Sequence, residues 1–255
     1  EIDPDYTNAY YNRGIVKNDL KDYEGVIEDY SKAIKLNPEY TNAYYNRGIV
    51  KYDLGDYKGS IEDFNKVIEI DPEYTDAYYN RGISKNDLED YEGVIEDYSK
   101  AIELDPEYTN AYNNRGFSKI QLEDYKGAIE DFNKAIELDP EDAFAYANRG
   151  FSKDNLGDFK GAIEDFNKAI ELDPEDFYAY NSRALSKKSL EDFKGAIKDF
   201  NKAIEIDPEN TWAYLSRGST KIQLEDYQGA IEDFNKVIEL DPEDSWAYAK
   251  RGMAK

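Results

Sequence analysis

Proline recurs in this chain at one fixed interval, and this regularity restricts the possible folds more than any other feature. The eight prolines are all spaced 34 residues apart, at Pro4, Pro38, Pro72, Pro106, Pro140, Pro174, Pro208 and Pro242. A constant period of this size indicates tandem copies of one supersecondary unit that stack on each other. Seven complete copies are predicted, over residues 7–40, 41–74, 75–108, 109–142, 143–176, 177–210 and 211–244.

Each copy is predicted to form two helices joined by a tight turn, as the second copy illustrates. Its first helix should run from Thr41, the predicted N-cap, to about Leu54. Asp56 is the predicted N-cap of the second helix, which carries apolar residues at spacings of three and four. Because proline cannot continue a helix, Pro72 should end it. The expected fold class is therefore all-α.

The repeated residues resemble those of the tetratricopeptide family, whose pattern is W-x2-L-G-x2-Y, then A-x3-F, then P, within one unit. The fifth copy carries Tyr146, Gly150, Ala162, Phe166, Ala169 and Pro174 at these places. It departs from the pattern at Arg149 and Lys153, and every copy repeats these departures, which resemble the variant with Asn-Arg-Gly in each unit. The resemblance implies a right-handed superhelical solenoid of 34-residue helix-turn-helix repeats.

Composition excludes several classes of function. The chain has 56 acidic and 32 basic residues, a formal net charge of -24, so we expect neither a nucleic-acid nor a membrane partner. Histidine and cysteine are absent, which removes the commonest general base and all thiol chemistry. Together with the lack of phosphate-loop, nucleophile or metal-ligand motifs, this predicts no enzyme activity, no metal and no cofactor. No apolar run could span a bilayer and no signal segment opens the chain, which favours a soluble, cytoplasmic protein.

Comparison of the copies with each other separates constant positions from variable ones. Constant positions, such as that of Tyr10 and Arg13, are most simply packing positions. The variable positions follow steps of three and four along the first helix and therefore share one face. They hold Asn8, Tyr11, Ile15 and Asn18 in the first copy, Phe144, Ala147, Phe151 and Asp154 in the fifth, and Trp212, Leu215, Ser219 and Ile222 in the seventh. The resemblance implies that this face lines a concave groove for ligands; alternatively, the side chains only fill space between successive helices.

One position beside this face holds an asparagine in each of the first five copies, and we call this set the asparagine column: Asn12, Asn46, Asn80, Asn114 and Asn148. An amide can hydrogen-bond the backbone of an extended peptide without reading its sequence. The column resembles the asparagine ladder of the O-linked N-acetylglucosamine transferases; the alternative is that each amide bonds its own scaffold or water. The predicted peptide-binding surface comprises these asparagines with Asn8, Tyr11, Asn42, Tyr45, Tyr52, Tyr79, Asn110, Asn113, Phe117, Phe144, Phe151, Tyr178 and Trp212.

A charged pair is predicted inside each copy. The arginine of Asn-Arg-Gly stands where the family usually has an apolar residue, and a partly buried guanidinium needs an acceptor. An aspartate recurs on the facing helix, which predicts the pairs Arg13–Asp29, Arg47–Asp63, Arg81–Asp97 and Arg115–Asp131.

These observations predict a scaffold or adaptor that binds an extended peptide or a partner helix. Two alternatives stay open: a substrate-targeting arm of a larger, glycosyltransferase-like enzyme, and a self-assembling structural array. Residues 1–6 match the tail of a preceding repeat, and residues 245–255 match the first helix of an eighth. We therefore expect an excised piece of a longer array whose complementary ends associate head to tail.

Overall fold

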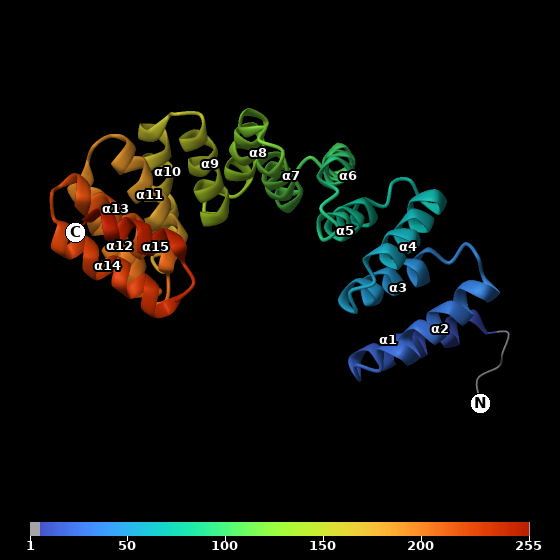
Figure 1. The fold of residues 1–255 in the computed structure, drawn as a ribbon. Helices are drawn as coiled ribbons and strands as arrows, with labels where there is room; N and C mark the ends of the chain where they lie inside the picture. The colour runs from blue at the N-terminus through green and yellow to red at the C-terminus, as the bar shows by residue number, and fades with distance from the viewer. Residues whose placement is uncertain (1–5, 255) are drawn as a thin grey trace. The chain divides into compact units, whose positions relative to one another are not determined.

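The structure, a computed structural model, describes residues 6–254 and contains, over that range, fifteen α-helices and no strand (Figure 1). The odd-numbered, first helices of the repeats are α1 (Thr7–Asp19), α3 (Thr41–Asp53), α5 (Thr75–Asn86), α7 (Thr109–Gln121), α9 (Ala143–Asn155), α11 (Phe177–Ser189), α13 (Thr211–Gln223) and α15 (Ser245–Ala254). The second helices are α2 (Tyr23–Leu36), α4 (Tyr57–Ile70), α6 (Tyr91–Leu104), α8 (Tyr125–Leu138), α10 (Phe159–Leu172), α12 (Phe193–Ile206) and α14 (Tyr227–Leu240). The predicted all-α fold of tandem helix pairs is confirmed, while residues 1–5 of the predicted leading fragment lie outside the described residues.

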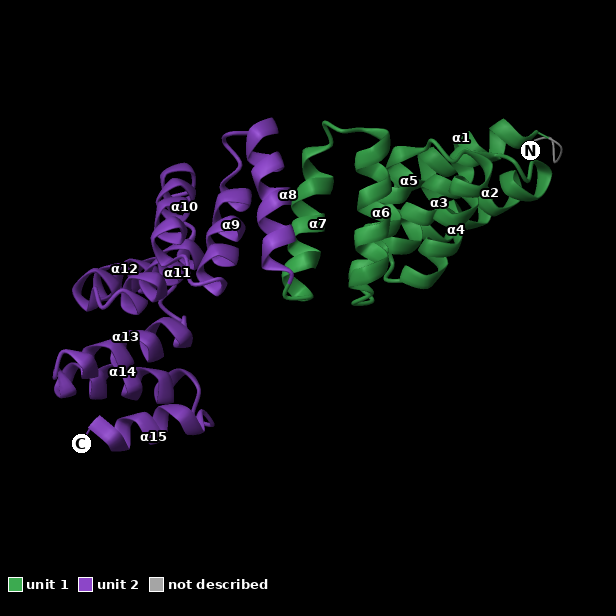
Figure 2. Cartoon of the chain, turned by 90° about the horizontal axis from the view of Figure 1, so that it is seen from above, with its two compact units in different colours: residues 1–123 green, residues 124–255 purple. Residues whose placement is uncertain are grey.

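The chain divides into two compact units, residues 1–123 and residues 124–255 (Figure 2). Helices α1 to α7 belong to the first unit, and α8 to α15 belong to the second. Within each unit, the two helices of a repeat pack against each other, and the second helix also packs against the first helix of the next repeat. Each unit is thus a row of helix pairs that share their neighbours.

Short polar segments begin and end the second helices. The Asp56 side chain caps α4 by accepting a hydrogen bond from the Gly59 backbone N–H at 3.0 Å. At the other end, Asp71 leaves the helical conformation, and its carboxylate accepts from the Glu73 backbone N–H at 3.1 Å. The aspartate before each later proline, and Asn37 before Pro38, therefore close a turn as the helix ends.

The prediction that Thr41 caps the first helix α3 is wrong. The N-cap is Tyr40, whose side chain makes no capping hydrogen bond, and the Thr41 hydroxyl instead donates to the Glu39 carbonyl at 3.4 Å. In unit 2 the residue equivalent to Tyr40 is an aspartate or asparagine that does cap, as when Asp142 accepts from the Ala145 backbone N–H at 3.0 Å. The two units therefore begin their first helices in different ways.

The core of a repeat is a buried aromatic ring under a glycine of the first helix, except in the sixth repeat, where Ala184 takes the glycine's place beside Phe200. Phe64 is fully buried, and a Cβ on Gly48 would lie 3.0 Å from its ring, so this close approach favours glycine. The turn between the two helices of a repeat requires a residue with a positive φ. Gly55 has φ of +78°, and the equivalent Glu89 adopts a similar left-handed conformation, with φ of 59°.

Candidate peptide-binding surface

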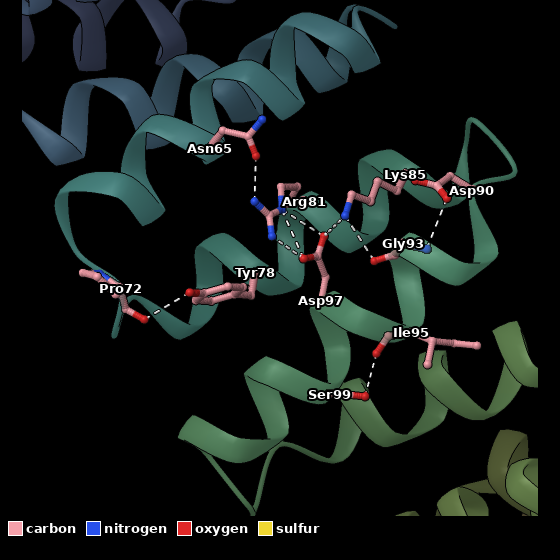
Figure 3. Close-up of polar contacts among 10 residues, drawn as sticks. All are labelled: Asn65, Pro72, Tyr78, Arg81, Lys85, Asp90, Gly93, Ile95, Asp97 and Ser99. Carbon is pink, nitrogen blue, oxygen red and sulfur yellow. Dashed lines mark hydrogen bonds and ion pairs between the residues drawn. The ribbon is translucent and has the colours of Figure 1, made fainter.

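A charged cluster fixes the first helix of each repeat, and Figure 3 shows it in the third repeat. Arg81 on α5 donates from Nε to Asp97 on α6 at 3.0 Å, and from Nη2 to the other oxygen of the same carboxylate. Lys85 Nζ lies 2.9 Å from Asp97, which is only 2% exposed. Arg81 Nη1 donates to Asn65 on α4 at 2.6 Å, so one guanidinium joins three helices.

The same ion pair recurs in five other repeats. Arg13 lies 2.5 Å from Asp29, and Arg47 lies 2.5 Å from Asp63. Burial alone would raise the pKa of Asp29, but hydrogen bonds from Arg13 and Lys17 keep its pKa below the ordinary value. In unit 2, the equivalent pairs are Arg149–Asp165, Arg183–Asp199 and Arg217–Asp233. The fourth predicted pair, Arg115–Asp131, joins residues of different units and stays a prediction.

Tyrosine rings form a layer along the first helices of unit 1. Tyr45 packs against Tyr74, with ring centroids 5.0 Å apart, and against Phe64 at 5.8 Å. Burial, with contributions from Asp76 and Tyr74, raises the pKa of Tyr45 to about 12. The equivalent contacts in the neighbouring repeats are Tyr11–Tyr40 and Tyr79–Tyr108. The rings of Tyr11, Tyr45 and Tyr79 are therefore half-buried packing elements of the repeat.

The asparagine column is attached to this tyrosine layer. Asn46 Nδ2 donates to the Tyr11 hydroxyl at 2.8 Å, and Asn80 Nδ2 donates to the Tyr45 hydroxyl at 3.0 Å. Asn114 bonds Tyr79 in the same way at 3.0 Å. Each bond crosses from one repeat to the preceding one, so the amides are held in place by the scaffold. Among residues 6–254, no hydrogen bond is donated to the side-chain Oδ1 atoms of Asn46, Asn80 and Asn114, and the hydroxyls of Tyr30 and Tyr98 also interact with the Asn46 and Asn114 amides.

A hollow of about 310 Å³ lies beside Asn46, between α1, α2 and α3. Its other lining residues are mainly apolar: Ile15, Asn18, Tyr30, Ile49 and Val50. A second hollow, of about 510 Å³, lies near the turn after the first repeat and is lined by Pro38, Glu39, Tyr44, Lys66, Glu69 and Ile70. Lys66 and Glu69 form an ion pair at 2.5 Å there, so that surface already satisfies its own charges. The smaller hollow is the one that adjoins the predicted peptide-binding residues.

Family comparison agrees with the repeat structure. The family model described as "Tetratricopeptide repeat" matches residues 41–74, 75–108, 109–142, 143–176, 177–210 and 211–244, and the one described as "TPR repeat" matches residues 16–55. The chain belongs to the tetratricopeptide repeat family. Membership supports a protein-interaction scaffold, and repeats of this family are typically non-catalytic.

Solved structures of tetratricopeptide repeat proteins share the fold. The C-terminal part of a repeat-containing protein from Cytophaga hutchinsonii aligns with a TM-score of 0.77 at 18% identity, over 94% of this chain and 98% of that one. YrrB, described as a TPR protein with an unusual peptide-binding site, aligns with a TM-score of 0.62 at 26% identity, over 74% of this chain and 97% of that one. MamA aligns with a TM-score of 0.61 at 29% identity, over 63% and 94%. No curated protein sequence matches the chain.

The tetratricopeptide repeats of unit 2 present a different first-helix face. Tyr178 is 68% exposed and Trp212 is 44% exposed, and Phe144 and Phe151 are exposed as well. In this unit a capping aspartate or asparagine stands where each early repeat ends in tyrosine. An apolar face of this kind is typical of a site for protein contact.

The structure places the remaining predicted site residues unevenly. Asn8, Asn12, Asn42, Asn110 and Phe117 are exposed, whereas Tyr52 and Asn148 are half-buried. Asn113 is only 7% exposed, so it lies under the surface rather than on it. Sequence reasoning missed the packing role of Tyr40, Tyr74 and Tyr108, although tyrosine ends only the early repeats and so offered a signal.

Within the described part of the chain, no group of acidic side chains is arranged to hold a metal ion. Over the same residues, every helix is too short or too polar to cross a membrane.

Proposed function

We propose that the chain is a non-catalytic protein-interaction scaffold whose first helices in unit 1 bind an extended peptide. The observation that supports this most strongly is the row of asparagines held by tyrosines. An amide whose Nδ2 is bound to the scaffold has a fixed orientation, so a ligand need not order it. Its carbonyl oxygen then offers one acceptor per repeat to the backbone N–H groups of a peptide.

The hollow beside Asn46 complements these acceptors. Its lining by Ile15, Ile49 and Val50 suits an apolar side chain of the same peptide. A helix is about 10 Å wide and an extended chain advances about 3.3 Å per residue, so roughly three peptide residues correspond to each repeat. A peptide of about ten residues would reach Asn46, Asn80 and Asn114. The description of YrrB as peptide-binding supports this class of ligand.

A library of random peptides of about twelve residues would test the proposal, with the affinity of each selected peptide measured by calorimetry. Replacing Asn46, Asn80 and Asn114 together with alanine should weaken binding by about 10- to 1,000-fold, because three hydrogen bonds of about 0.5–1.5 kcal/mol each are lost. Glu62→Ala, at an exposed position of the second helix α4, is the control and should leave the affinity unchanged.

A second set of variants separates binding from scaffold support. Tyr11→Phe, Tyr45→Phe and Tyr79→Phe remove the hydroxyls that hold the amides but keep the rings. We expect an intermediate loss of affinity, because the amides remain but are no longer fixed. Peptides that bind the asparagine variant as tightly as the original chain would contradict the proposal.

A further inference from the structure

The hollow beside Asn46 has two lining residues that the equivalent places in later repeats do not share. Asn18, which is exposed, corresponds to the larger Tyr52 in the second repeat. Val50, which is 3% exposed, is replaced by serine in each of the next four repeats. A short polar residue on one first helix and an apolar residue on the next are therefore combined between α1 and α3 in particular.

Tyr52 shows how a larger side chain occupies the equivalent place in the second repeat. Its ring packs against Tyr57, with the ring centroids 5.4 Å apart. Burial, followed by a hydrogen bond to the Asp87 carboxylate just after α5, raises the pKa of Tyr52 to about 12. The Tyr52 side chain thus reaches from α3 to the end of the next first helix. The shorter Asn18 leaves the hollow between α1 and α3 open.

An acidic residue stands at the end of the first helix in the first three repeats. Asp19 and Asp53 are the last residues of α1 and α3, and Asp87 directly follows α5. Because the helix dipole disfavours a carboxylate at this end, such a residue is stabilised by a cation or a hydrogen-bond donor. Asp87 has the Tyr52 hydroxyl, whereas Asp19 and Asp53 are exposed and form no ion pair among residues 6–254. The later repeats have uncharged residues here: Gln121, Asn155, Ser189 and Gln223.

These two carboxylates border the hollow. Tyr30 is part of its lining; burial raises the pKa of Tyr30 to about 12, and the nearby charge of Asp19 adds to this effect. Asp53 is equivalent to Asp87, which the side chain at the position of Asn18 reaches in the second repeat. The described lining residues themselves carry no charge. An uncharged, mainly apolar hollow therefore lies next to two carboxylates that have no cation.

We propose that the hollow beside Asn46 binds one large apolar side chain of a peptide, such as leucine, and that Asp19 and Asp53 bind a lysine or arginine next to it. The inference rests on the proposed function and adds a sequence requirement to it. Asn18 determines this specificity, because its short side chain leaves the hollow open. A volume of about 310 Å³ is at the lower end of the roughly 300–1,000 Å³ of small-molecule sites, which suits a single side chain. The net charge of -24 also favours association with a basic ligand.

Methyl NMR tests this directly, because Ile15 and Ile49 line the hollow and the method also detects weak binding. The probes are blocked peptides as long as those of the library, with Leu-Lys between Gly and Ser residues, and twins with Ala-Lys or Leu-Gln instead. We expect saturable shifts of both isoleucine methyl signals with the Leu-Lys peptide. The affinity should be about tenfold lower for the Ala-Lys twin, because less apolar surface is buried. It should be about threefold lower for the Leu-Gln twin, and added salt should weaken binding of the lysine peptides only.

Variants of the chain assign the effect to the hollow. Asn18→Tyr should lower the affinity for the Leu-Lys peptide about tenfold, because the ring should occupy the hollow as Tyr52 occupies the equivalent place. Asn18→Ser leaves the hollow open and should retain the affinity. Asp19→Asn together with Asp53→Asn should reduce the affinity to that for the Leu-Gln twin. Glu62→Gln, at an exposed position of α4, is the matched control and should change nothing. The methyl spectrum of each free variant would show that it folds.

Several results would overturn the inference. The absence of saturable shifts at Ile15 and Ile49, or equal affinity for the Leu-Lys and Ala-Lys peptides, would exclude an apolar anchor in the hollow. Unchanged affinity in Asn18→Tyr would show that this residue does not control access. Shifts that depend on protein concentration without peptide would indicate that a second copy of the chain occupies the hollow.

The inference and the proposed function can fail independently. Asn80→Ala together with Asn114→Ala changes no lining residue of the hollow. If this pair of substitutions leaves the affinity of selected library peptides unchanged while Asn18→Tyr lowers it, the hollow is a binding site but the asparagines do not bind an extended peptide. If the asparagine substitutions lower the affinity and Asn18→Tyr does not, the proposed function stands and this inference is wrong.

Discussion

The pair Arg81–Asp97 gives the most quantitative test of how these repeats hold together. Arg81→Met removes three hydrogen bonds to Asp97 and one to Asn65, while Lys85 still lies 2.9 Å from the carboxylate. Removing one partner of a buried pair costs about 3–5 kcal/mol. Because Lys85 still compensates the charge, we expect the lower end, about 3 kcal/mol, for Arg81→Met. Asp97→Asn should cost about as much, because it leaves two cations without their anion.

The coupling energy from a double-mutant cycle isolates the pair itself. We expect about 2 kcal/mol between Arg81 and Asp97, against about 0.2–1 kcal/mol for exposed pairs. The pair Lys100–Glu103 on the same helix α6 is the matched control. Its atoms lie 2.8 Å apart, but its side chains are 37% and 68% exposed, so its coupling should lie in the lower range.

Urea unfolding followed by far-UV circular dichroism would supply the free energies for both cycles. Since long repeat arrays depart from two-state unfolding, hydrogen exchange of α5 and α6 should accompany it. Equal coupling in the two pairs would refute the reasoning, because burial would then add nothing to the ion pair at Asp97.

Three further predictions concern stability. Asn181 is 1% exposed, its Oδ1 has no hydrogen-bond partner among residues 6–254, and the next repeat has Leu215 at the equivalent position. Asn181→Leu should therefore raise the free energy of unfolding, measured by urea unfolding, by about 1 kcal/mol. A lower free energy of unfolding would show that bound water satisfies the oxygen. Glu89→Gly should stabilise the chain by about 0.5–1 kcal/mol because φ is positive at this residue, and Gly55→Ala should destabilise it by a similar amount. Urea unfolding midpoints equal to that of the original chain would contradict this. Asp29 has a lowered folded pKa, so its contribution should be fully present above the unfolded value of about 4 and be lost as pH falls through the folded pKa. The difference in unfolding free energy between the original chain and Asp29→Asn should therefore shrink only in acid.

The sequence predicted the helices well because proline and the short turns allow few alternatives. The first helix of the second repeat ends at Asp53, one residue before the predicted Leu54, and the second ends at Ile70, just before Asp71-Pro72. The N-cap at Thr41 was a wrong prediction. A helix start can be fixed by packing instead of a capping bond, and the ring of Tyr40 packs against Tyr11.

The candidate site was harder to predict because its key contacts join different repeats. The asparagine column is visible in the sequence, but the bond from Asn46 to the Tyr11 hydroxyl joins residues 35 apart. Variation between the repeats at one position does not show whether an aromatic ring there is packed or exposed.

The contact between the first and last residues of a repeat has a consequence for how such chains are lengthened. Tyr108 donates to Asp76 and stacks on Tyr79, so all three residues lie within the third repeat. A gene duplication or crossover that copies this segment whole carries the contact with it. A crossover between the third and fifth repeats that falls inside the segment would instead join Tyr79 to the capping Asp176, leaving the ring without its neighbour. Recombination between the two halves is therefore compatible with folding mainly where the exchanged segment begins and ends at the proline turns.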